Sequence, residues 1–256
     1  MHVGEVVTLK ELSERELKVL AYPRFEQAEV EKRLKELKKL GVKALEFTGE
    51  KQAFGTPVLG KGCVGIVVLA YTISGKAALK IRRVDADRKE MFHEGEMLKK
   101  ANSIDVGPKL FDISENFLLM QLIEGTHFPE WIELLEGKEA QSLVRTVLED
   151  VLRQCYRLDE ARLDHGELSN ASKHILVDAG DKPFLVDFET ASTNRRVSNV
   201  TSVCQYLFLR SKIATKVRKK LVEIEEKELM KALRAYKQKR TEENFEKILQ
   251  KAELRK

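Results

Sequence analysis

The stretch Gly60-Lys61-Gly62-Cys63-Val64-Gly65-Ile66-Val67 decides the fold, because its three glycines lead into a strand. The residues from Ile66 to Ile73 are mostly β-branched, aliphatic or aromatic, Ser74-Gly75 forms a turn, and a second apolar run follows. This pattern predicts a glycine-rich loop joined to a pair of antiparallel strands. A dinucleotide-binding loop with the same glycine spacing would instead run directly into a helix, so that class is disfavoured.

A lysine on the second strand, Lys80, suggests what the loop does. Glycines let a backbone close over phosphate groups, and a lysine on the next strand adds a positive charge to them. The alternative is an ordinary glycine-rich hairpin with a surface lysine, because short motifs also arise by chance. Under the first interpretation, the nucleotide-binding residues are Gly60, Lys61, Gly62, Gly65, Val67 and Lys80.

Residues 87–101 have a helical pattern, and a carboxylate of this helix is expected to hold Lys80 in place. Glu94 is the preferred partner, because Leu98 one turn later would pack on the sheet while the acid faces the lysine. Glu90 and Glu96 are the alternatives.

Two further strands are expected in residues 106–113 and 116–125. At the end of the second, the backbone groups of Gln121 and Leu122 would meet the edge of an adenine ring. Residues 141–158 follow with apolar side chains at helical spacing, which predicts a long amphipathic helix.

After this helix come Asp164-His165-Gly166-Glu167-Leu168-Ser169, then Ile175-Leu176-Val177, then Val186-Asp187-Phe188. Together with the glycine loop and Lys80, this ordered set resembles the RIO-type atypical kinases, a group that includes the kinase subunit of the KEOPS tRNA-modification complex. Within that group the chain most resembles archaeal tRNA kinases that phosphorylate a ribose 2′-hydroxyl of the variable-loop uridine. The resemblance covers about residues 55–210.

The resemblance implies an α+β, bilobal protein-kinase-like fold, with a small antiparallel-sheet lobe and a mostly helical lobe. The expected divisions are an N-terminal helical extension over 1–54, the small lobe over 55–122, and the large lobe with basic C-terminal helices over 123–256. ATP and Mg²⁺ are the implied cofactors.

The same resemblance implies roles for individual residues, although two positions depart from the family pattern. Glu167 stands where the family has its catalytic aspartate and keeps a carboxylate for orienting or deprotonating a hydroxyl, with Lys80 and Glu94 completing the catalytic set. Asp187 is the implied metal carboxylate. His174 occupies the place before the Ile-Leu pair where the family has a metal-binding asparagine. Because Mg²⁺ prefers oxygen ligands, a histidine is an unusual ligand for this ion. The other candidates for that role are Ser172 and Asn170, and Asp164 is an alternative base.

Composition narrows the cellular setting. Three separated cysteines without a Cys-x-x-Cys pair indicate a reducing compartment and disfavour a disulfide scaffold. The N-terminus lacks the pattern of a signal peptide, and the longest apolar stretch is too short to span a bilayer. We therefore expect a cytoplasmic protein without membrane attachment; the sequence names no protein partner.

Charge placement points to the substrate. The net charge is +5, and no acidic residue occurs between Glu189 and Glu223. A polyanion such as tRNA would be attracted to a basic window beside the metal loop, although a solvated basic helix is the simpler alternative. The basic residues of this window are Arg195, Arg196, Arg210, Lys212, Lys216, Arg218, Lys219 and Lys220.

Three functions are compatible with these features. The preferred one is an ATP-dependent kinase that phosphorylates a tRNA ribose hydroxyl, because the basic window is present and no Ala-Pro-Glu follows Asp187. The second is a Ser/Thr protein kinase that acts on protein, mainly on itself. The third is a non-catalytic nucleotide-binding switch in an RNA-processing assembly, which the changes at Glu167 and His174 favour.

Overall fold

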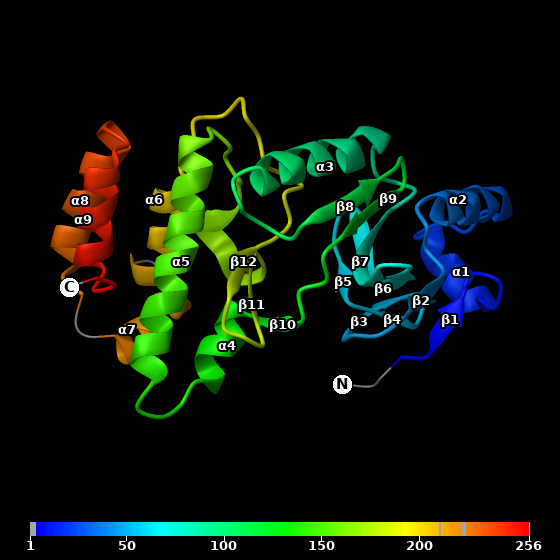
Figure 1. Cartoon of the computed structure of the whole chain (residues 1–256), viewed down its shortest axis with the longest axis horizontal. Coiled ribbons are helices and arrows are strands. Elements are labelled where there is room, and N and C mark those ends of the chain that lie inside the picture. Colours follow the sequence, from blue (N-terminus) through cyan, green and yellow to red (C-terminus); the bar gives the residue numbers. More distant parts are fainter. Residues whose placement is uncertain (1–3, 210, 222–223, 256) are drawn as a thin grey trace. The chain divides into compact units, whose positions relative to one another are not determined.

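The computed structural model describes residues 4–209, 211–221 and 224–255. The chain divides into two compact units, one formed by Met1–Lys99 with Pro108–Leu122 and the other by Lys100–Gly107 with Ile123–Lys256. Figure 1 labels their helices and strands. Within the described parts of the chain, every helix is too short or too polar to cross a membrane.

The first unit is built on an antiparallel sheet in the order β1-β2-β6-β7-β9-β8, with β5 pairing to β6. A separate hairpin is formed by β3 and β4. The strands are β1 (Val6–Thr8), β2 (Ala44–Glu46), β3 (Lys51–Ala53), β4 (Thr56–Val58), β5 (Gly60–Lys61), β6 (Gly65–Thr72), β7 (Gly75–Arg82), β8 (Leu110–Ile113) and β9 (Phe117–Met120). The helices are α1 (Glu14–Leu20), α2 (Gln27–Lys39) and α3 (Arg88–Asn102).

The first 54 residues share a hydrophobic core with this sheet. Leu20 and Leu37 of the first two helices lie in the same buried cluster as Ile66, Leu79 and Phe117 of the strands. The residues expected to form a helical extension thus also supply β1 and β2, which extend the sheet beyond β6.

A fully buried arginine, Arg33, ties α2 to the sheet. Its guanidinium donates to the carbonyls of Leu20 and Arg82 at 2.5 and 2.6 Å and to Asn116 Oδ1 at 3.0 Å. The Nε group donates to Glu29 Oε1 at 2.7 Å. Burial lowers the pKa of Arg33, and this set of acceptors compensates the buried charge.

The second unit is mostly helical. Its strands β10 (Gly125–His127), β11 (Ile175–Asp178) and β12 (Pro183–Leu185) form a small antiparallel sheet. Its helices are α4 (Phe128–Leu134), α5 (Ala140–Glu160), α6 (Asn199–Cys204), α7 (Lys212–Lys220), α8 (Glu226–Gln238) and α9 (Glu242–Lys251), with a short 3-10 helix at Leu168–Lys173. The apolar stripe of α5, including Val144, Val151 and Leu158, is fully buried. These two units confirm the predicted α+β class.

Candidate active site

The residues expected to carry chemistry fall into two groups, one in each unit. In the first unit, β6 and β7 pair so that Val67 lies opposite Lys80. Lys80 Nζ forms an ion pair with Glu94 Oε2 at 2.7 Å, and both side chains are more than nine-tenths buried. Of the three candidate acids, the structure thus brings Glu94 to the lysine. Glu96 is exposed, and the Glu90 side chain lies outside the described residues.

The glycine loop packs directly over Lys80. A Cβ at Gly65 would lie 3.0 Å from both Lys80 Cγ and the carbonyl oxygen of Ile81, so only glycine leaves this space clear. The loop is closed by the Gly62 N–H, which donates to the Gly65 carbonyl at 2.8 Å. Lys61 instead directs its ammonium to the carbonyl of Gln52 at 3.1 Å. Its contribution to nucleotide binding would therefore come from its backbone.

The hydrogen bonds at the end of β9 restrict which backbone groups could contact an adenine ring. The backbone N–H of Gln121 donates to the Lys109 carbonyl at 2.8 Å, and Gln121 Oε1 accepts from the Lys109 N–H at 3.2 Å. Because this N–H is already used, a backbone donor for an adenine edge would have to come from Leu122.

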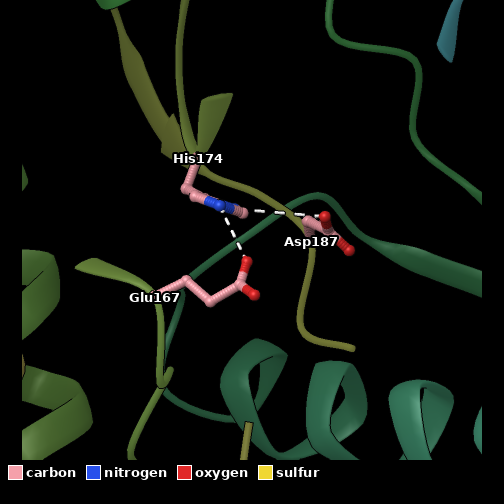
Figure 2. Close-up of side chains that lie close together, drawn as sticks. All are labelled: Glu167, His174 and Asp187. Atoms are coloured by element: carbon pink, nitrogen blue, oxygen red, sulfur yellow. Dashed lines mark ion pairs between the residues drawn. The ribbon is translucent and has the colours of Figure 1, made fainter. Parts of the chain in front are cut away.

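In the second unit, Glu167, His174 and Asp187 lie together, as Figure 2 shows. Glu167 precedes the 3-10 helix, His174 ends it, and Asp187 follows β12. His174 Nε2 lies 2.8 Å from Glu167 Oε2, and His174 Nδ1 lies 4.0 Å from Asp187 Oδ2. The two carboxylates are about two-fifths exposed, whereas the imidazole is nine-tenths buried.

The other residues weighed for the metal and base roles have different surroundings. Ser172 Oγ donates to Asn170 Oδ1 at 3.4 Å. Asp164 is buried, and its carboxylate accepts from Arg195 Nε and from the Ser198 N–H, both at 3.1 Å. Asp164 therefore holds the following loop in place, which is a structural use of this carboxylate.

His165 is a functional neighbour to which sequence reasoning assigned no role. Its Nε2 lies 3.1 Å from the Val186 carbonyl and donates to it, because a carbonyl only accepts. Burial lowers the pKa of His165 to about 4, so the ring is neutral at pH 7. Its backbone N–H donates to Asn199 Oδ1 at 2.8 Å. The His-Gly motif signals this residue, but nothing local signals Asn199, which lies 34 positions further along the chain.

Asp187 has a strained backbone, with φ of 70°. Non-glycine residues avoid this left-handed region, and such conformations persist at functional sites where the surroundings enforce them. The Val186 N–H donates to the His174 carbonyl at 3.0 Å, which fixes the chain immediately before Asp187. The Asp187 carboxylate thereby lies beside the His174 ring.

The donors around His174 fit a divalent cation. One oxygen of Glu167, one of Asp187 and an imidazole nitrogen all lie within 4.8 Å of one another. His174 Nδ1 is buried and forms no hydrogen bond with any described residue. A buried nitrogen without a hydrogen-bond partner, beside a carboxylate, suits a metal ion better than it suits an apolar packing role.

The sheet of the first unit carries a buried lysine–glutamate pair, and the helical unit carries carboxylates beside short strands. Together these features are typical of the kinase-like class of proteins. A sequence model of the RIO domain matches residues 70–201, about half of the chain. The chain belongs to this RIO-domain family, whose members are kinase-like and use ATP and a divalent metal ion.

The matched stretch contains Lys80, Glu94, Glu167, His174 and Asp187, whereas the glycine loop and the basic residues beyond position 201 lie outside it. The chain is also similar to the uncharacterized protein MJ1211 of Methanocaldococcus jannaschii, with 28% identity over 98 residues. That match covers 35% of this chain and 83% of the archaeal protein.

The basic residues of the window after Glu189 differ in their surroundings. Lys216 pairs with Glu133 and Arg218 with Glu226, while Lys220 donates to the Leu135 carbonyl. Arg195 pairs with Asp164, and Arg196 donates to the Lys237 carbonyl at 3.1 Å. Lys212 and Lys219 are exposed and form no ion pair with another described residue. Arg210 lies outside the described residues.

Proposed function

We propose that this protein is an ATP-dependent RNA kinase that transfers the γ-phosphate to a ribose hydroxyl of tRNA, with the 2′-hydroxyl of the variable-loop uridine as the expected acceptor. The observation that carries the choice of RNA is the presence of exposed basic side chains, Arg196, Lys212 and Lys219, in the same unit as Glu167 and Asp187. A phosphate backbone is the polyanion that exposed lysines and arginines attract.

The chemistry assigned to each residue is simple. Glu167 has a second oxygen, Oε1, beyond the one next to His174, and its partly exposed carboxylate would accept the proton of the ribose hydroxyl. The ribose oxygen forms a bond to the γ-phosphorus, and the bond to the bridging oxygen of ADP breaks. Lys80, fixed by Glu94, would neutralise charge on the ATP phosphates.

Asp187 and His174 would hold the divalent ion of the family, which neutralises phosphate charge when bound. Positioning and charge neutralisation account for most of the catalysis in this type of transfer, so little covalent chemistry is asked of the protein.

The test is transfer of labelled γ-phosphate from ATP to unmodified tRNA and, separately, to a generic protein, with Asp187→Asn as the control. Label on tRNA that disappears in the variant supports the proposal, and nuclease mapping then locates the nucleotide. Label confined to protein would replace it with a Ser/Thr protein kinase. ATP binding without transfer to either acceptor would make the protein a nucleotide-binding switch.

A further inference from the structure

The surroundings of His174 determine which ring nitrogen carries a proton. Nε2 faces Glu167 Oε2 at 2.8 Å, and an ionised carboxylate accepts hydrogen bonds without donating them. Nε2 is therefore protonated, and in the neutral ring Nδ1 presents a lone pair. Figure 2 shows the ring between the two carboxylates, with Nδ1 toward Asp187.

That lone pair has no other use in the described part of the chain. Nδ1 is buried without a hydrogen-bond partner, and the 4.0 Å to Asp187 Oδ2 is too long for a hydrogen bond. An unsatisfied buried polar atom costs on the order of 1–3 kcal/mol, a cost that a bound metal ion would offset. The ring of His165 packs edge-on against His174 at 5.4 Å and fixes its plane.

Two ligand atoms of one metal ion lie at most roughly 4.2 Å apart, since each bond to nitrogen or oxygen is about 2.1 Å long. The separation of His174 Nδ1 and Asp187 Oδ2 falls inside this limit. Histidines that bind metals commonly donate their other N–H to a carboxylate, which orients the ring and raises its basicity. Glu167 stands in that position relative to His174.

We propose that His174 Nδ1 and Asp187 form a binding site for a divalent first-row transition-metal ion, with Glu167 as the residue that positions the imidazole. This inference rests on the proposed function and deepens it by naming the class of metal ion. Mg²⁺ binds oxygen ligands and keeps several waters, whereas an imidazole nitrogen favours ions such as Mn²⁺ and, more strongly, Co²⁺. The histidine thus shifts the preference of the site away from Mg²⁺.

Pulsed electron paramagnetic resonance of the full-length protein with Mn²⁺ alone tests the nitrogen ligand directly. The wild-type spectrum should show coupling of Mn²⁺ to a directly bound nitrogen, and labelling the histidines with ¹⁵N should change that coupling to the ¹⁵N pattern. His174→Asn should abolish it. His93→Asn, which removes an exposed imidazole of the other unit, should leave it unchanged.

Calorimetric titration with Co²⁺ and Mg²⁺ gives the selectivity. We expect His174→Asn to weaken Co²⁺ binding by about tenfold or more, because even the loss of an outer-sphere partner of a metal ligand typically costs about 10–100-fold in affinity. Mg²⁺ binding should change far less, because the asparagine supplies an amide oxygen.

Bound Mn²⁺ without nitrogen coupling in the wild-type protein would overturn the proposal, and so would the absence of Mn²⁺ binding. The wild-type measurement needs no variant, so a folding defect of His174→Asn leaves the test intact. Neither measurement contains RNA or ATP. Nitrogen coupling without transfer to tRNA would count only against the proposed function, and transfer without coupling only against the metal assignment.

Discussion

Glu94 is almost fully buried and forms an ion pair with Lys80, the residue assigned to the ATP phosphates. Glu94→Gln would leave the lysine charge buried without its counter-ion, and breaking such a pair typically costs roughly 3–5 kcal/mol. We therefore expect a lower melting temperature. We also expect ATP binding to weaken about tenfold or more, because a displaced ammonium that loses about 1.4 kcal/mol of interaction with the phosphates lowers the affinity tenfold.

Glu96→Gln is the matched control, because this glutamate is exposed on the same helix. It should change neither thermal unfolding nor an ATP titration. Equal effects of the two substitutions would show that the 2.7 Å ion pair does not set nucleotide affinity.

Asp187 combines the carboxylate assigned to the metal ion with a left-handed backbone, and the two can be separated by substitution. Asp187→Ala and Asp187→Gly both remove the carboxylate, so both should abolish phosphate transfer. Only glycine adopts φ of 70° without strain. We expect Asp187→Gly to be more stable than Asp187→Ala by about 1 kcal/mol in denaturant unfolding. The reverse order would mean that the backbone here is unstrained.

At the scale of elements, a buried carboxylate joins three helices of the second unit. Asp159 of α5 accepts from the backbone and side chain of Asn199 of α6 at 2.9 and 2.8 Å, and from the Tyr236 hydroxyl of α8 at 3.0 Å. Burial raises the pKa of Asp159 despite these donors. The folded state therefore keeps this proton at pH values where the unfolded state has lost it, and the contribution of Asp159 to stability falls as the pH rises above about 4.

Tyr236→Phe removes one donor to the ionised form of Asp159. We expect a loss of about 1–3 kcal/mol in the free energy of unfolding at pH 7, and a smaller loss near pH 4, where the protonated form needs the donor less. Denaturant titrations at the two pH values measure both. Tyr156→Phe is the control, because that ring stacks on Phe245 at 4.4 Å and its hydroxyl forms no hydrogen bond with a described residue. A Tyr236→Phe effect that does not depend on pH would contradict this account.

Elements whose signals are local could be predicted from the sequence. Ser13 and Glu16, three positions apart, cap α1 with reciprocal hydrogen bonds, and the glycine loop leads into the expected pair of strands. Contacts between distant segments could not. Gln121 forms hydrogen bonds with Lys109, and Asp164 accepts one from Arg195. These contacts depend on how strands and loops come together, and the spacing of residues in the sequence does not predict them.

At the scale of the whole molecule, the charge of a surface also depends on contacts between segments that are distant in the sequence. The sequence window between Glu189 and Glu223 has no acid, but acids from elsewhere approach it in space. Glu133 lies on α4 and pairs with Lys216, and Glu226 lies on α8 and pairs with Arg218. An ion-paired lysine or arginine must give up its partner before it can neutralise an RNA phosphate. The exposed Lys212 and Lys219 are therefore the better candidates for phosphate contacts.

This distinction gives a prediction that separates an RNA surface from an ordinary solvated helix. Each phosphate contact contributes about 0.7–0.9 to the slope of log affinity against log salt concentration. Replacing Lys212 and Lys219 together with Gln should reduce that slope for tRNA by roughly 1.5 and should not alter ATP binding. Replacing Lys216 and Arg218 together with Gln, a change of the same charge on the same helix, should reduce it by clearly less. Binding titrations of full-length protein and tRNA at several salt concentrations measure both slopes. Equal slopes for the wild type and the Lys212/Lys219 variant would mean that α7 does not contact the RNA, and the tRNA substrate would then lose its main structural support.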